Sequence, residues 1–293
     1  MPACGCIWQP YSRPYFYFKS TVIMKINNEL SFPFIKFFPL VIFFSLFTVA
    51  ASAQISPPGL GKANTAFWMA LGWRQPLDTA GKVTSLSYIG VGRTSDPAGD
   101  ANPFHHQAIL VLNQEFYQHY SKNKEFSYAL SYRRQNSYEE TYPYHSADPA
   151  IEQEFRIYGR YALSTDVGRL KWKNTLRQEF RKFFTPDFKT GEENFQFRTR
   201  IKSQLSMPLP GPNHNKLSGS AEVLFSISKE HLPVQWTSYG YRETRFTVYY
   251  TTHPLHLPWT IDIGYMNDLL GAGHNITDVH YLALDIIWEG KRH

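Results

Sequence analysis

Residues 171–182, KWKNTLRQEFRK, alternate between two kinds of position. The odd positions are all polar or charged, whereas Trp172, Leu176 and Phe180 stand on the opposite side. A period of two indicates a β-strand with one polar and one apolar face. The segment is longer than the usual strand of about five or six residues, and it suits a tilted strand that crosses a bilayer, which needs about 9–11.

The same alternation recurs along the chain, in segments separated by breaks rich in Gly, Pro, Asn and Asp. It predicts ten strands: Lys82–Arg93, His106–His119, Lys124–Gln135, Ile151–Leu163, Arg169–Phe183, Asn194–Met207, Lys216–Ser228, Tyr241–His253, Pro258–Asn267 and Thr277–Trp288. A further segment, Thr65–Arg74, is either a lead-in or one of two extra strands of a twelve-stranded barrel.

The breaks between these strands favour a closed barrel. Short breaks such as 75–81 and 164–168 alternate with long ones such as 94–105 and 136–150, as in outer-membrane barrels with short periplasmic turns and longer outer loops. We therefore expect an all-β fold, a single-domain, all-antiparallel transmembrane β-barrel of about ten strands, alternatively twelve. A secreted soluble β-barrel or β-sandwich that binds a ligand is the alternative, because it would show the same two faces.

The one long apolar run is residues 37–50, FFPLVIFFSLFTVA, which follows Lys25 and Lys36 and precedes the small residues 51–53. This order is typical of a cleaved signal peptide, and the run is short for a membrane-spanning helix of about 20 residues. We expect residues 1–23 to precede the true start at Met24, 24–53 to be the signal peptide, 54–81 a lead-in or extra strand, and 82–293 the barrel of a Gram-negative outer-membrane protein.

The only two cysteines, Cys4 and Cys6, precede the expected cleavage site. Disulfides, Cys-ligated zinc, thiol catalysis and a lipid anchor are thereby excluded for the exported part. The formal charge of +6 owes much to residues before that site, so it indicates no nucleic-acid binding.

The charged faces of the expected strands would line the barrel lumen. Because that lumen is narrow, facing Arg and Glu side chains should form a network that fills it and holds the strands in register. The alternative is a narrow, porin-like passage that prefers anions, since basic side chains outnumber acidic ones. The expected lumen residues are Arg133, Arg156, Arg160, Arg177, Glu179, Arg181, Arg198, Arg200, Lys202, Glu222, Glu243 and Arg245.

Several short motifs together resemble a known family: YRR at 132–134, NTLRQEFR at 174–181, FRTR at 197–200, AEVLF at 221–225, RETRF at 242–246 and DIGYM at 262–266. Over about Phe126 to Trp288 the chain resembles the DUF2490 proteins, uncharacterised bacterial outer-membrane barrels. The resemblance implies a barrel and an outer-membrane address, but no activity and no catalytic residues. One departure is the chain end, where EGKRH follows Trp288, whereas many outer-membrane barrels end on an aromatic residue.

No enzyme motif stands out. A lipid-modifying enzyme would need Ser, His and an acid together at a strand end, and no G-x-S-x-G occurs. His105, His106 and the other loop histidines lack metal-ligand spacing, so we expect no catalytic residues, no metal and no cofactor. The expected partners are outer-membrane lipid, the barrel assembly machinery and a small solute or anion, with no nucleic acid, and the barrel is expected to be a monomer.

Overall fold

The computed structural model describes residues 55–290 apart from 97–99, 140, 212, 232 and 272–275. No helix among these residues is long and apolar enough to cross a membrane. The expected signal peptide and start site lie outside the described residues. The strands are β1 Thr65–Pro76, β2 Val83–Thr94, β3 His106–Ser121, β4 Lys124–Tyr138, β5 Ser146–Val167, β6 Leu170–Phe184, β7 Thr190–Pro208, β8 Lys216–Glu230, β9 Gln235–Trp236, β10 Gly240–Thr252, β11 Trp259–Leu270 and β12 Thr277–Glu289.

All ten predicted strands are present, and the uncertain segment at Thr65 is a strand as well. The main difference lies in the expected loop 136–150, which is partly strand. Here β4 and β5 continue beyond the expected ends until Tyr138 pairs with Ser146. The alternation that predicted the strands fades in this stretch because both of its faces are polar.

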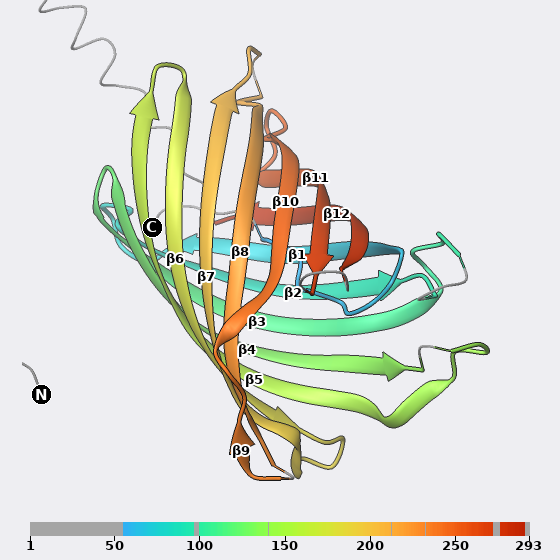
Figure 1. The fold of residues 1–293 in the computed structure, drawn as a ribbon. Helices are drawn as coiled ribbons and strands as arrows, with labels where there is room; N and C mark the ends of the chain where they lie inside the picture. The colour runs from blue at the N-terminus through green and yellow to red at the C-terminus, as the bar shows by residue number, and fades with distance from the viewer. Residues whose placement is uncertain are drawn as a thin grey trace, which may run out of the picture. The chain divides into compact units, whose positions relative to one another are not determined.

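The strands form one continuous sheet that closes on itself (Figure 1). Of its twelve described strands, the two-residue β9 pairs with β8 only, so eleven form the wall. Neighbouring wall strands are antiparallel except at the closing seam, where β1 runs parallel to β12 with Thr65 opposite His280. The expectation of an all-antiparallel barrel is wrong at this seam, because an odd number of strands that run alternately up and down must close with two parallel strands. Closure leaves no free strand edge.

Residues 55–64 explain how the chain reaches its first strand. The two-residue turns 122–123 and 168–169 lie at one end of the barrel, the short-turn end, and the longest connections, 95–105 and 231–239, lie at the other, the long-loop end. Strand β1 starts at the long-loop end, where Ala66 lies opposite Thr94. The segment before it runs through the inside of the barrel, since Ser56, Pro57 and Leu60 contact inward-facing side chains. Of the two readings of 54–81, the extra strand applies to Thr65–Pro76, and the preceding residues form a strandless crossing of the lumen.

The interior of the barrel has two zones. One is apolar and gathers around residues 55–64, the lumen segment, with Leu60, Trp68, Ile109 and Tyr281 among its buried members. The other is charged and is lined by β4 to β8 and β10. Because the lumen segment and the charged side chains occupy the interior, this barrel resembles a packed core rather than an open tube.

Candidate functional site

All twelve predicted lumen residues lie on the inward faces of their strands, alternating with side chains that point outward. Residues adjacent in the sequence differ widely in exposed fraction: Arg156 has no exposed surface, whereas Ile157 is 60% exposed. Arg200 is 4% exposed while Ile201 is 50% exposed. On the strands that carry these residues, the inward face is therefore the charged one and the outward face the apolar one.

Glu179 on β6 is the centre of the charged zone. Its carboxylate lies 3.1 Å from Arg156 Nη1, 2.7 Å from Arg177 Nε and 2.9 Å from Arg200 Nε. These three arginines come from the three neighbouring strands β5, β6 and β7, so one buried carboxylate ties three strands together. They are ion pairs rather than hydrogen bonds, because neither Glu179 oxygen accepts a hydrogen bond from a described residue.

Two further centres, the Glu154 carboxylate and the Arg245 guanidinium, continue this network. Glu154 accepts hydrogen bonds from Arg156 Nε at 2.7 Å and from Arg181 Nη2 at 2.6 Å. On the other side, Arg245 lies 2.5 Å from Glu243 and 3.3 Å from Asp268. Glu222 joins the two parts, because Arg200 Nη1 lies 2.8 Å and Arg245 Nη1 3.9 Å from its Oε1 atom.

The remaining predicted residues lie at the margins of the network. Arg160 pairs with Glu115 at 3.3 Å. Arg198 donates from Nε to the side-chain oxygen of Gln196 at 3.0 Å, and Lys202 donates to Ser56 Oγ at 3.2 Å. Among the described residues, no carboxylate lies within 4.0 Å of the Arg133 or Arg198 guanidinium, so neither guanidinium forms an ion pair there.

The lumen segment is anchored on the same network. Arg245 Nη1 donates to the Pro57 carbonyl oxygen at 3.2 Å, and the Leu60 amide donates to the Tyr281 hydroxyl at 3.0 Å. Gly59 fits only because it lacks a side chain, since a Cβ there would lie 2.8 Å from Arg245 Nη2. The segment is thus fitted to this interior.

Sequence reasoning missed several inward residues. Glu115 and Glu154 share the parity of predicted lumen residues on their own strands, so the alternation could have revealed them. Asp268 lies at the end of β11, beyond the predicted strand. The segment around Gly59 carries no periodic signal, and its place inside the barrel depends on contacts with residues far along the chain.

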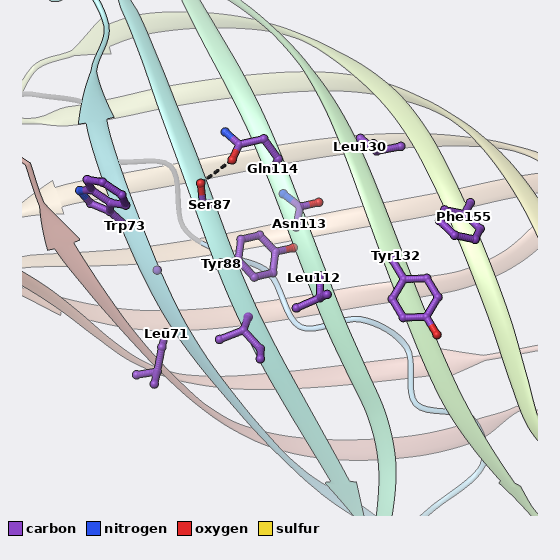
Figure 2. Close-up of a pocket in the computed structure, with 12 residues that line it drawn as sticks. Leu71, Trp73, Ser87, Tyr88, Leu112, Asn113, Gln114, Leu130, Tyr132 and Phe155 are labelled. Carbon is purple, nitrogen blue, oxygen red and sulfur yellow. Dashed lines mark hydrogen bonds between the residues drawn. The ribbon is translucent and has the colours of Figure 1, made fainter.

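A shallow groove of about 620 Å³ lies on the outer wall across β1 to β5. Its outward lining is mostly apolar and includes Leu71, Trp73 and Leu130. Ser87 donates a hydrogen bond to Gln114 within it (Figure 2). This pairing leaves the groove with little polar surface to offer a soluble ligand.

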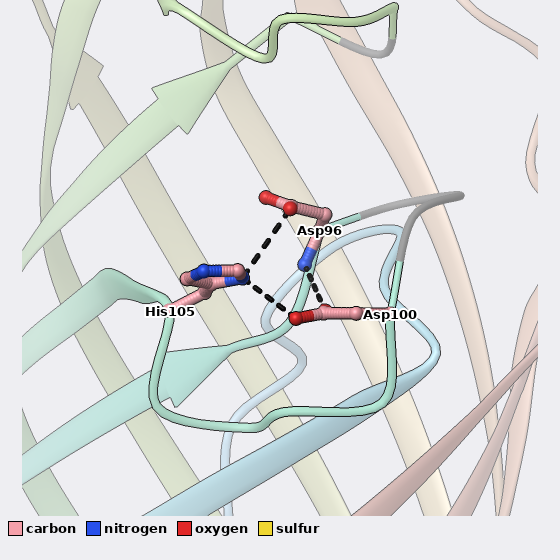
Figure 3. Close-up of side chains that lie close together, drawn as sticks. All are labelled: Asp96, Asp100 and His105. Atoms are coloured by element: carbon pink, nitrogen blue, oxygen red, sulfur yellow. Dashed lines mark hydrogen bonds and ion pairs between the residues drawn. The ribbon is translucent and has the colours of Figure 1, made fainter.

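The loop between β2 and β3 holds the one group of three metal-binding side chains found among the described residues (Figure 3). His105 Nδ1 lies 2.7 Å from Asp100 and 3.3 Å from Asp96, and His106 Nε2 lies 2.5 Å from Asp96. His105 and His106 were expected to lie in a loop; His105 does and is exposed, whereas His106 is the first residue of β3 and is partly buried. The three side chains already pair with one another, which accounts for their proximity without a metal.

Comparison with known proteins gives one match. A family model described as "Protein of unknown function (DUF2490)" matches residues 91–277. No curated protein and no solved structure matches the chain.

Proposed function

The chain belongs to the DUF2490 family of proteins of unknown function, and we propose that it is a bacterial outer-membrane β-barrel whose lumen is closed by its own N-terminal segment. On this proposal it serves as a rigid membrane scaffold for its long loops, and any passive transport requires the lumen segment to move.

The observation that carries the proposal is the distribution of side chains between the two faces of the wall. Apolar side chains such as Ile157, Ile201, Val248 and Leu282 cover the exterior, while buried arginines and carboxylates occupy one zone of the interior. A water-soluble barrel needs the opposite distribution of side chains, because it must bury apolar surface and expose charged groups to water. Lipid is the solvent that suits this exterior, and a closed barrel is one of two structures that satisfy every backbone group in lipid.

Aromatic side chains at the short-turn end support the same proposal. Trp73, Trp172 and Trp288 are all exposed, and with Trp259 they lie near the ends of β1, β6, β12 and β11 that adjoin the short turns. Tryptophans concentrate where a membrane barrel meets the polar headgroups.

The path of the lumen segment agrees with short turns on the periplasmic side. An exported chain arrives in the periplasm, yet β1 begins at the long-loop end. Residues 55–64 lie inside the lumen, so a chain that arrives from the periplasm can reach the start of β1 without a twelfth wall strand. The apolar run 37–50 has the features of a signal peptide and therefore also supports export.

A narrow anion path is the second candidate function. Arg133 and Arg198 face the lumen without a carboxylate within 4.0 Å among the described residues, and basic side chains at a constriction favour anions. The proposal assigns no catalytic step to this barrel.

Migration on a detergent gel with and without boiling tests the proposal, together with fractionation of cells that express the full chain. A folded membrane barrel should migrate faster before boiling than after, and it should sediment with the outer membrane. A protein that is found in the periplasmic fraction and migrates equally in both states would contradict the proposal.

A further inference from the structure

Two aspartates face each other across neighbouring strands inside the barrel, away from the arginine network. Asp262 on β11 lies directly opposite Asp285 on β12, and neither has any exposed surface. Thr251 donates a hydrogen bond to Asp262 Oδ1, and Trp68 Nε1 donates to Asp285 Oδ1 at 3.1 Å. One oxygen of each carboxylate is therefore held in place.

The second oxygen of each carboxylate has no partner. Asp262 Oδ2 and Asp285 Oδ2 are both buried without a hydrogen bond. Within the described residues, no Lys, Arg or His lies within 4.0 Å of either group. The cationic side chains that act on Asp262 from farther away are Lys216 and Arg74, and Arg74 pairs with Glu289 at 2.5 Å. Two neighbouring buried carboxylates that are both ionised repel each other strongly unless a positive charge lies between them.

Tyr249 on β10 adds a third oxygen that lacks a partner. It is 1% exposed, and its hydroxyl has no hydrogen bond. Its ring lies over Gly264, where a Cβ would be 2.3 Å from the ring, and Gly264 is two residues from Asp262 on the same inward face. The charges of Asp285 and Asp262 both act on this hydroxyl. The ring over Gly264 and this electrostatic interaction place the Tyr249 hydroxyl in the same part of the interior as the carboxylate pair.

We propose that Asp262, Asp285 and the Tyr249 hydroxyl bind one divalent cation of the Ca²⁺ class. Oxygen ligands from carboxylates and neutral groups suit this class of ion, and Ca²⁺ tolerates irregular geometry. A charge of +2 balances the two carboxylates, and the site lies near the short-turn ends of β11 and β12. The site belongs to the barrel wall, so it does not depend on membrane insertion.

Terbium luminescence provides the test, because a bound Tb³⁺ ion would lie close to the Trp68 and Tyr249 rings and emit when they are excited. The titration uses the folded full barrel in detergent, with Asp96→Asn and Asp100→Asn introduced to remove the surface cluster. We expect saturable emission that Ca²⁺ displaces, and a lower emission amplitude in Trp68→Phe.

Asp285→Asn and Asp262→Asn should each weaken Tb³⁺ binding at least tenfold. The matched control is Asp278→Asn, which removes an exposed carboxylate from the same strand and should leave binding unchanged. Unboiled gel mobility shows that each variant is folded. The proposal is overturned if the folded protein shows no emission, or if emission is equal in Asp285→Asn and Asp278→Asn. A proton shared by the two aspartates would then account for their proximity.

Discussion

Arg245 holds the lumen segment in place by donating from Nη1 to the carbonyl oxygen of Pro57 at 3.2 Å. The same guanidinium contacts Glu243 on its own strand β10 and Asp268 on β11, so the segment is attached to a side chain that carboxylates on two strands hold in place. This relationship links the closure of the lumen to the network that stabilises the wall.

Gly59→Val should displace the lumen segment. The new side chain would meet Arg245 Nη2, which cannot move far because two carboxylates hold it. We expect a loss of about 1–3 kcal/mol in the free energy of unfolding, as for other overpacked sites, and new single-channel openings in planar bilayers. Gly240→Ala is the matched control, because a Cβ added there would meet no atom within 4 Å. Equal conductance in the two variants would argue against closure by the segment.

Glu179→Gln should destabilise the wall strongly. Removal of the shared carboxylate charge leaves Arg156, Arg177 and Arg200 with reduced compensation, and breaking a buried ion pair costs about 3–5 kcal/mol. Urea unfolding in micelles measures the change. Glu192→Gln, on an exposed position of β7, should change the unfolding free energy by less than about 0.5 kcal/mol. Comparable effects of the two substitutions would refute a structural role for the network.

The fold was largely predictable from residues such as those at 171–182, because alternation follows directly from strand geometry. The parallel seam between β1 and β12 was not predictable. Whether the number of wall strands is even or odd depends on the end of the barrel at which the first strand begins. That start depends on how Gly59 and Leu60 fit the interior, which no local pattern encodes.

The candidate site was predictable in part for a related reason. The charged lumen residues stand out from apolar neighbours, whereas Trp68 and Val111 face inward and yet look like lipid-facing residues. Asp262 and Asp285 lie in separate strands, and only their register brings them together.

Gly90→Ala should disturb the apolar zone of the lumen. A Cβ at this position would lie 2.2 Å from the Trp68 ring, whereas one at Gly219 has its nearest neighbour at 3.9 Å. We expect a loss of about 1–3 kcal/mol for Gly90→Ala and a shifted tryptophan emission. Gly219→Ala, also within a strand, should show neither change, and similar behaviour of both would mean that Trp68 does not pack there.

Ile157→Arg should weaken the barrel in lipid vesicles. Ile157 lies at the middle of β5 and faces outward, where an arginine at the bilayer midplane costs about 2–4 kcal/mol. Tyr142→Arg provides the control, since Tyr142 lies in a loop and is 86% exposed. Unfolding free energies that match in the two variants would place Ile157 in water.

Spin labels along β7 test the central claim most directly, because residues 54–293 contain no cysteine and single cysteines can be placed at each of positions 197–205. Labels at the outward positions 197, 199, 201, 203 and 205 should be accessible to oxygen and shielded from a water-soluble nickel complex in lipid vesicles. Labels at 198, 200, 202 and 204 should be shielded from both reagents by the filled lumen. The contradicting result is that the outward labels are as accessible to the nickel complex as a label at Tyr142. That result would rule out a membrane barrel with this orientation.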